Sequence, residues 1–249
     1  MLHFNGLNMD SKANWVMRSL LQGWTAPGDH FWGFINDNES QIKDLTAQGK
    51  DWYFWDMPYY GRWLPGVDKY YWRGSRNSLH YKHVIDYPND RFRQWNVTPQ
   101  EYGSGSKILV CPSSETMTRY TTGMDVKMWV SMVTMALQKH TDRYIEVRYK
   151  PRNAKTSGPA AAIIPFEEQA QNTHCVVTCI SLAAIDAQLL GIPTICHPDS
   201  FAADISSTRL DEIENPQRVD TQQWFNNLAY SQFTHAEIES GFAQEILYA

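Results

Sequence analysis

The pattern of apolar and polar positions changes near residue 103. Beyond it, short apolar runs such as "KILVCP" and "HCVVTC" alternate with stretches that carry apolar residues at helical spacing. Strands that alternate with helices and lack polar positions inside them indicate a parallel sheet covered on both faces. The pattern predicts strands at 107–112, 144–150, 174–179 and 192–196, and helices at 123–139 and 181–191.

Further sequence signals support the two predicted helices and indicate the structure of the tail. The helix at 123–139 places Val126, Trp129, Val130, Val133 and Leu137 on one face. The helix at 181–191 is rich in Ala and Leu and is expected to end at Gly191. The tail from 220 to 247 is expected to form two helices, with Thr234 as the cap of the second.

The first hundred residues predict a smaller and more aromatic α/β region. "DHFWGFI" and "KDWYFWD" indicate strands at 29–35 and 50–56, with helices expected near 12–23 and 38–48. "YGSGSK" at 102–107 has the composition of a short flexible link. We therefore expect an N-terminal α/β domain at 1–103 and a C-terminal α/β domain at 104–249, facing each other across a hinge.

Charge and cysteine usage limit the possible classes of function. The net charge of −5 argues against a protein coated for nucleic acid, although residues 60–107 hold eight basic against four acidic residues. That local excess leaves room for a polyanionic ligand. The four cysteines include no CxxC pair and are expected to be buried thiols rather than zinc ligands.

Membrane association is not indicated by the sequence. The chain has no apolar run near the roughly 20 residues that a membrane span needs. Its first residues also lack a basic start followed by an apolar stretch. We expect a cytoplasmic protein that does not associate with a membrane.

Candidate ligand-binding residues lie where the predicted strands end. Ligands of open parallel sheets bind at the carboxyl ends of the strands. Ser181 there would either cap its helix or leave backbone N–H groups for an anion, and Asp186 lies further along the same helix. Ser113 and Ser114 follow the first strand of the region, and His197 follows the last.

The exit of the strand at 144–150 is basic. Arg148, Lys150 and Arg152 alternate there, which suits a diphosphate, although a solvated charged edge is the alternative. The chain has neither a GxGxxG turn after a strand nor a P-loop motif. It also has no D-x-D triplet, so we expect no metal site.

The order "VRYKP … CVVTCISLAAIDAQLLGIPTI" resembles the C-terminal domain of two-domain GT-B glycosyltransferases and capsule-polysaccharide transferases. Those families show a basic strand exit and then S-x-x-x-x-E/D-A-x-x-x-G-x-P. The resemblance implies two Rossmann-like domains with parallel sheets facing a central cleft, and a metal-independent transfer from a nucleotide-sugar donor, with no permanently bound cofactor. The family's acidic donor contact, usually Glu, matches Asp186, whose side chain is shorter.

The tail "LAYSQFTHAEIESGFA" and the segment "YFWDMPYYGRW … YYWRGSRNSLHY" are similar to a group of phage-encoded glycosyltransferases. That resemblance implies an acceptor such as a 5-hydroxymethylpyrimidine in phage DNA, reached by extruding the base. The acidic net charge leaves a saccharide or another small acceptor open.

The acceptor and the catalytic base are expected in the N-terminal region. Asp56 ends an apolar run and is the candidate general base, unless it only caps the next turn, and His80 is its rival. Arg73, Arg76 and Asn77, with their aromatic neighbours, would hold a phosphodiester and a stacked base, or a sugar. The competing classes are a non-catalytic nucleotide-binding protein and an enzyme that hydrolyses or epimerises the sugar nucleotide.

Overall fold

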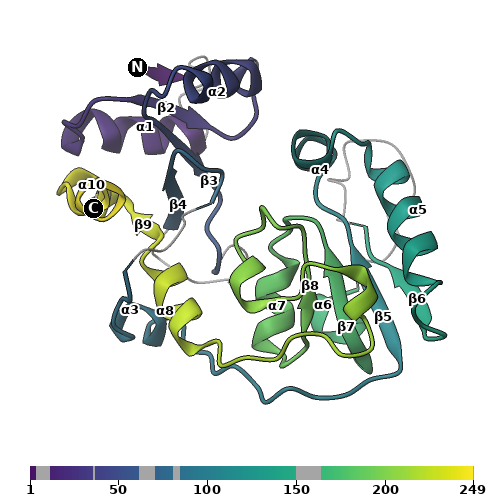
Figure 1. Cartoon of the computed structure of the whole chain (residues 1–249). Coiled ribbons are helices and arrows are strands. Elements are labelled where there is room, and N and C mark those ends of the chain that lie inside the picture. Colours follow the sequence, from purple (N-terminus) through teal and green to yellow (C-terminus); the bar gives the residue numbers. More distant parts are fainter. Residues whose placement is uncertain (4–11, 36, 62–70, 81–84, 150–163, 249) are drawn as a thin grey trace. The chain divides into compact units, whose positions relative to one another are not determined.

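The chain forms two compact units in the computed structural model, which describes residues 1–3, 12–35, 37–61, 71–80, 85–149 and 164–248 (Figure 1). Unit 1 comprises residues 1–96 and 223–249, and unit 2 comprises residues 97–222. Each unit has its own β-sheet and its own helices. None of the helices in the described residues combines the length and apolarity that crossing a membrane requires.

Unit 2 contains the parallel sheet that the sequence predicts. Its strand order is β6-β5-β7-β8, and every pair in it is parallel. Val110 pairs with Val147, and Cys111 pairs with Thr178. The strands are β5 (Lys107–Cys111), β6 (Tyr144–Val147), β7 (Thr173–Thr178) and β8 (Thr194–Ile195).

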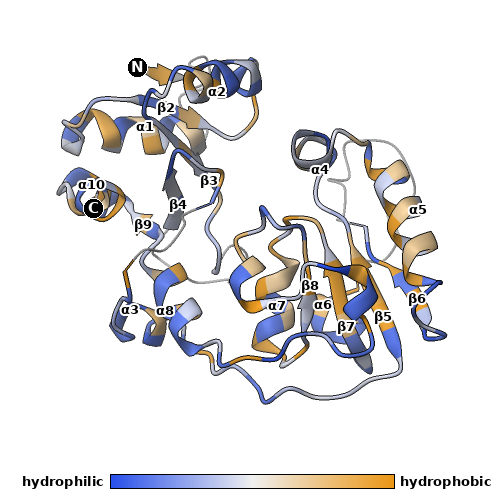
Figure 2. Cartoon of the chain, viewed as in Figure 1, coloured by the Kyte–Doolittle hydropathy of each residue, from blue (hydrophilic) through white to orange (hydrophobic). Residues whose placement is uncertain are grey.

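The helices of unit 2 include two that the sequence analysis missed. They are α4 (Glu115–Thr122), α5 (Val126–Leu137), α6 (Phe166–Gln169) and α7 (Ala183–Leu189), with 3₁₀ turns at Ala203–Ile205 and Leu210–Glu212. The predicted face of α5 is buried, apart from the half-buried Val126. Figure 2 shows β7 and α5 among the apolar segments. The missed helices are α4 and α6. The start of α4 is marked by the cap Ser114 rather than by apolar spacing, and α6 is only four residues long.

The segment at 102–107 is packed against unit 2 and is not a flexible link. The Gly103 N–H donates to the Gly191 carbonyl at 3.0 Å, and the Tyr102 hydroxyl donates to Gln188 Oε1 at 2.8 Å. Gly191 has a φ of +64°, and a Cβ at this position would lie 2.1 Å from the Glu101 carbonyl oxygen. The division between the units therefore falls near residue 96, earlier than expected.

Unit 1 has a mixed sheet, so the expectation of parallel sheets in both domains is wrong there. Its strand order is β1-β2-β3-β4-β9, with β4 antiparallel to both β3 and β9. The strands are β1 (Leu2–His3), β2 (Asp29–Trp32), β3 (Trp52–Asp56), β4 (Tyr71–Arg76) and β9 (Gln232–Thr234). Neither β4 nor β9 reads as an apolar run, because polar residues such as Arg73 and Gln232 are buried on them.

One face of this sheet packs an aromatic core. Trp55, Trp72 and Phe233 of the sheet meet Val16 and Leu247 of the helices. The helices of the unit are α1 (Lys12–Gly23), α2 (Asn38–Ala47), α3 (Asp90–Arg93), α8 (Gln222–Ala229), α9 (His235–Glu239) and α10 (Phe242–Tyr248). The tail thus holds helices and a strand rather than the two helices expected, although Thr234 caps α9 as predicted, in a capping box with Glu237.

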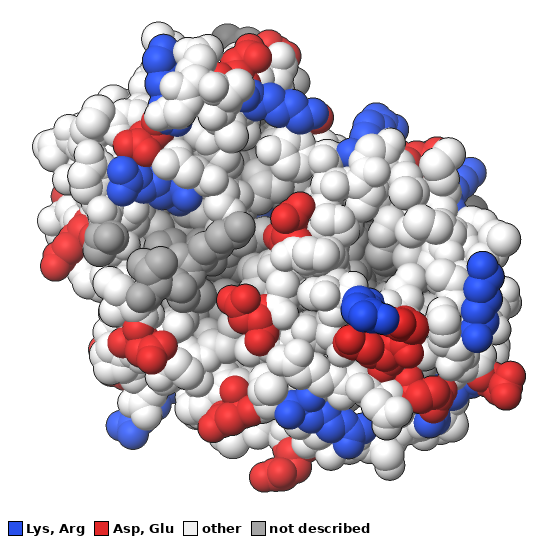
Figure 3. Space-filling model, viewed as in Figure 1, with Lys and Arg blue, Asp and Glu red and all other residues white. Residues whose placement is uncertain are grey.

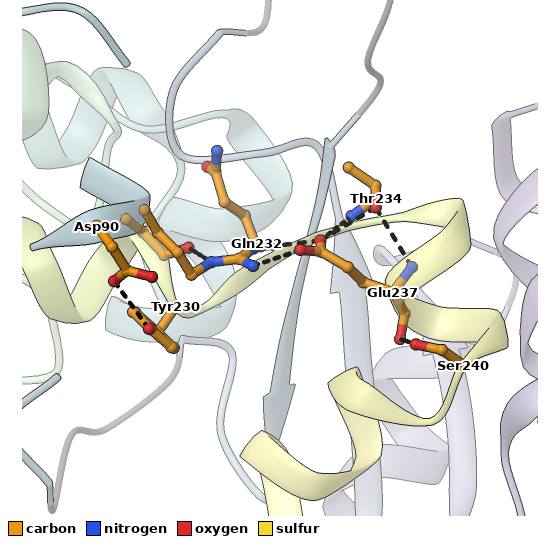
Figure 4. A network of polar contacts seen from close by, with 8 residues as sticks. Asp90, Tyr230, Gln232, Thr234, Glu237 and Ser240 are labelled. Atoms are coloured by element: carbon orange, nitrogen blue, oxygen red, sulfur yellow. Dashed lines mark hydrogen bonds and ion pairs between the residues drawn. The ribbon is translucent and has the colours of Figure 1, made fainter. Parts of the chain in front are cut away.

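A polar network around Arg91 ties the tail to unit 1 (Figure 4). Arg91 Nε donates to the Ala229 carbonyl at 2.9 Å, and Arg91 Nη2 donates to the Gln232 carbonyl at 2.7 Å. Its guanidinium also forms an ion pair with Glu237. These contacts explain why the segment from 223 belongs to unit 1, whereas the sequence analysis placed it with the C-terminal domain.

Candidate functional site

The exits of the parallel strands of unit 2 lie at one edge of its sheet. Ser113 Oγ accepts the Ile180 N–H at 3.0 Å, which joins the loops after β5 and β7. The His197 N–H donates to the Cys179 carbonyl at 3.1 Å, which joins the loop after β8 to them. We call this set of loops the carboxyl edge of unit 2. It brings together chain segments almost 90 residues apart.

The three predicted serines at this edge all accept backbone hydrogen bonds with their side-chain oxygens. Ser113 is 7% exposed and accepts from the loop after β7. Ser181 Oγ accepts the Ala183 N–H at 3.3 Å, and Ser114 Oγ accepts the Met117 N–H at 3.4 Å as the cap of α4. Ser114 is thus the N-cap of α4, whereas the N-cap position of α7 is Leu182 and Ser181 precedes it. Each serine hydroxyl keeps its own hydrogen as a donor.

Arg148 brings positive charge to the carboxyl edge. Its backbone N–H continues the pairing of β6 with β5 by donating to the Val110 carbonyl at 2.9 Å. Its guanidinium donates to the Ile164 carbonyl at 2.9 Å and to Gln169 Oε1, and lies 5.7 Å from the centre of the Phe166 ring. In the described part of the chain, the groups that contact this guanidinium are neutral, so its charge is not cancelled by direct pairing.

Asp186 lies in the first turn of α7 and is half-buried. Burial raises the pKa of the Cys111 thiol to about 12, the charge of Arg148 opposes that rise, and the charge of Asp186 adds to it. Both charges are therefore close enough to the end of β5 to act on the same thiol.

The remaining donor-binding candidates are His197 and Lys150. His197 follows β8, and its side chain is 31% exposed. Its Nδ1 accepts the Asp199 N–H at 3.2 Å. Lys150 and Arg152 lie outside the described residues. The structure thus brings six of the seven predicted donor-binding residues to the carboxyl edge of unit 2.

In unit 1, Asp56 is held at the end of β3 by two contacts. Its Oδ1 accepts the Met57 N–H at 2.7 Å, and its Oδ2 accepts from Arg73 Nη2 at 2.7 Å. The Arg73 side chain is buried, whereas that of Asp56 is 29% exposed. Both carboxylate oxygens are engaged, which matches the capping alternative, and the exposed part of the side chain is reachable from solvent.

His80 is buried beside the same arginine. Its Nδ1 lies 3.3 Å from Arg73 Nη1 and 3.3 Å from the Tyr59 hydroxyl. Burial, and then the charge of Arg73, lower the pKa of His80 well below its usual value, so the ring is neutral. Because a guanidinium can only donate, Nδ1 is the acceptor and the ring hydrogen is on Nε2. His80 therefore orients Arg73, and its basic nitrogen is engaged.

The predicted acceptor cluster separates into two places. Arg73 lies opposite Asp56, whereas Arg76 lies opposite Tyr53 at the other end of the β3–β4 pair. At that end Arg76 Nη2 is 3.0 Å from Asp51 Oδ2, and Asn77 Nδ2 donates to Asp51 Oδ1 at 2.7 Å. Arg76 and Asn77 thus both contact the Asp51 carboxylate, at the opposite end of the strand pair from Asp56.

The basic bias of residues 60–107 does not form an open cationic surface in the described residues. Four of its cations are each paired with a carboxylate: Arg73 with Asp56, Arg76 with Asp51, Arg91 with Glu237, and Lys107 with Glu146. On the face shown in Figure 3, basic and acidic side chains are interspersed. Clustering along the sequence therefore reflects internal ion pairing here.

Gln169, Glu146 and Phe166, which surround Arg148, were missed by the sequence analysis. Each acts on Arg148 directly or through a neighbour, and Gln169 is 21 residues away from it in the chain. No motif connects these positions, so the strand order was the one signal that could have suggested the contact.

Comparison with known proteins gives little beyond the structure itself. No known protein family matches the sequence, and no curated protein matches it. Among solved structures, the chain is similar to Thermosulfurimonas dismutans KpsC, beta Kdo 2,4 transferase, with 10% sequence identity and a TM-score of 0.46. The match covers 88% of this chain and 86% of that chain. A likeness at this level decides neither the fold nor the activity.

Proposed function

We propose that the chain is a glycosyltransferase whose nucleotide-sugar donor binds at the carboxyl edge of unit 2. The observation that carries the proposal is the Arg148 guanidinium, which is fixed at a strand exit by neutral partners. A cation of this kind neutralises the charge that develops on a departing nucleotide phosphate. In this proposal Arg148 carries out that role, without a resident cofactor or metal.

The chemistry requires one displacement and one proton transfer. The acceptor oxygen forms a bond to the anomeric carbon, and the bond from that carbon to the phosphate oxygen breaks, with its electron pair leaving on the nucleotide. The acceptor hydroxyl proton passes to a general base, for which Asp56 is the candidate. Arg73 and the Met57 N–H would hold its carboxylate in one orientation during this step.

The acceptor is the finer part of the proposal. The resemblance to phage-encoded transferases supports a 5-hydroxymethylpyrimidine in DNA. The pairing of the basic residues in 60–107 counts against a strongly cationic DNA-binding surface. A saccharide or small-molecule hydroxyl is therefore the second acceptor class, and the two are separated by assay.

The test combines donor binding with product analysis. The protein is incubated with a panel of nucleotide sugars and either hydroxymethylated DNA or an oligosaccharide pool, and the products are identified by mass. We expect Arg148→Ala to weaken nucleotide binding about tenfold. The control Arg209→Ala removes an exposed arginine of unit 2 and should bind as the unmodified protein does. Unchanged binding by Arg148→Ala would refute the donor site.

A second candidate function, nucleotide binding without catalysis, is favoured by the engagement of both Asp56 oxygens. Asp56→Asn separates the two functions. A transferase should lose turnover and retain its donor affinity, whereas a binding protein has no turnover to lose. Release of free sugar in the absence of any acceptor would indicate instead an enzyme that hydrolyses the donor.

A further inference from the structure

A chain of hydrogen bonds runs across the surface of unit 2 to Arg148. Lys107 Nζ donates to Glu146 Oε2 at 2.7 Å and to the Gln169 carbonyl at 2.7 Å. Gln169 Nε2 donates to Glu146 Oε1 at 2.6 Å, and Gln169 Oε1 accepts from Arg148 Nη1. Two strands and α6 supply the members, so the chain depends on the fold and not on local sequence.

We infer that Gln169 is a positioning residue, which fixes the Arg148 guanidinium for a phosphate-bearing ligand without cancelling its charge. The inference rests on the proposed function, because it takes Arg148 as the cation that contacts the donor. The side-chain amide has one donor end and one acceptor end. Its donor end faces a carboxylate and its acceptor end faces a guanidinium, so a flipped amide would lose both bonds.

The neutrality of Gln169 is what keeps Arg148 available. The only carboxylate in the chain of hydrogen bonds, Glu146, is already paired with Lys107, and that bond is the first cause of its lowered pKa. The negative charge is thus compensated at the Lys107 end, and a neutral amide lies between it and Arg148. A carboxylate at position 169 would pair with Arg148 directly and compete with an incoming phosphate.

The experiment measures dissociation constants for inorganic pyrophosphate and for uridine diphosphate by titration calorimetry. We expect Gln169→Glu to weaken both about tenfold and to flatten their dependence on salt, because the cation becomes internally paired. Gln169→Met removes the acceptor without adding charge, and should weaken both by about threefold. The controls are Gln171→Glu and Gln171→Met, which make the same changes at an exposed position two residues away and should stay within about twofold.

Uridine carries no phosphate, so the ratio of the affinities for uridine diphosphate and uridine is a readout that a purely structural role would not change. The affinity for uridine should be the same in the unmodified protein and in Gln169→Glu, while the preference for the diphosphate over uridine falls. Should Gln169→Glu unfold at the assay temperature, the double variant of Arg148→Ala with Gln169→Met decides the matter. A positioning residue adds no further loss once Arg148 is gone.

The outcomes separate the inference from the function on which it rests. If Arg148→Ala weakens pyrophosphate binding while Gln169→Glu binds as Gln171→Glu does, the positioning role is wrong and the proposed donor site stands. If Arg148→Ala binds pyrophosphate and uridine diphosphate normally, the donor site itself is wrong and the inference is overturned with it.

Discussion

Three arginines of unit 1 and Arg148 of unit 2 are used in opposite ways, although Arg119, Arg143 and Arg209 of unit 2 also pair with carboxylates. In unit 1, Arg73, Arg76 and Arg91 are each paired with a carboxylate of the same unit. In unit 2, Arg148 is held at a sheet edge by a carbonyl, an amide oxygen and an aromatic ring. In the first arrangement the positive charge is neutralised by a carboxylate of the fold. In the second the guanidinium is held in place by neutral groups, and its charge can act on a ligand.

The difference indicates where each kind of function is expected. Removing one partner of a buried ion pair leaves an uncompensated charge, so such arginines are expected to determine stability. An arginine whose contacts are neutral contributes less to folding and more to the binding of anions. The comparison therefore assigns a role in stability to Arg73, Arg76 and Arg91 and a role in ligand binding to Arg148.

The largest expected effect is on the stability of unit 1. Arg91→Ala would remove the ion pair with Glu237 and the bonds to the Ala229 and Gln232 carbonyls. We expect a loss of about 3–5 kcal/mol in the free energy of unfolding, because Glu237 stays partly buried without its partner. Urea denaturation followed by tryptophan fluorescence measures this loss, and pyrophosphate affinity should not change if the protein is folded.

The matched control for this variant is Arg93→Ala on the same helix, where the side chain is exposed. It should change the free energy of unfolding by less than about 0.5 kcal/mol. Equal effects of the two substitutions would contradict the idea that ion pairing in unit 1 determines its stability. A loss of pyrophosphate affinity in a folded Arg91→Ala protein would remove the distinction between the units.

The elements of unit 2 could be predicted because its apolar pattern and its packing agree. The run "HCVVTC" is buried along its whole length, and all but its last residue lie in β7. The spacing from Trp129 to Leu137 matches the buried face of α5. Unit 1 was harder, because β4 buries two polar residues: Arg73, which pairs with Asp56, and Ser75, which donates to the Ser78 carbonyl. Such a strand has no period-two apolar signal, so it was read as a polar binding cluster.

The candidate site shows the same limit. The gathering of strand exits follows from parallel topology, and the sequence therefore predicted where Ser113, Arg148 and Ser181 would lie. What the sequence could not predict is which partners each of these side chains contacts. That His80 is buried against Arg73, or that Gln169 holds Arg148, depends on tertiary contacts with no repeat or motif behind them.

An intermediate effect is expected on lowering the pH. Burial lowers the pKa of His80 and His235 in unit 1 and of His174 in unit 2. In the unfolded chain these rings titrate near a pKa of about 6.5, so below that pH the unfolded state binds protons that the folded state does not. Stability should be full above about pH 6.5 and should fall as the pH drops below it, by up to about 1.4 kcal/mol per pH unit for each histidine.

Tryptophan fluorescence reports mainly on the unfolding of unit 1, because nearly all the tryptophans belong to it. Fluorescence-detected unfolding at pH 7.5 and pH 5.5 should show the fall in stability. His235→Gln should reduce it, since Trp72 Nε1 donates to His235 Nε2 only while that ring is neutral. The exposed His140 provides the control His140→Gln, which should keep the full fall. Stability that is flat between these pH values would refute the buried, neutral state of the rings.

The smallest expected effect distinguishes two helix caps. Ser114 caps α4 at the carboxyl edge of unit 2, and Thr234 caps α9 in unit 1. Replacing either residue by Ala should cost about 1 kcal/mol of stability, because one backbone donor loses its acceptor. Thermal or urea unfolding measures both losses on the same scale.

Ligand binding should separate the two caps even though their costs in stability agree. Only Ser114 stands at the edge to which we assign the donor, so Ser114→Ala should also weaken pyrophosphate binding, by about twofold to threefold. The expected effect is modest because Glu115 puts a negative charge in the same turn, which disfavours an anion there. That charge is partly compensated by the hydrogen bonds that Glu115 accepts from Arg119 and from the Val126 N–H. If Ser114→Ala and Thr234→Ala bind pyrophosphate equally well, the loop after β5 takes no part in the site, and phosphate recognition would have to depend on the Arg148 side of the edge.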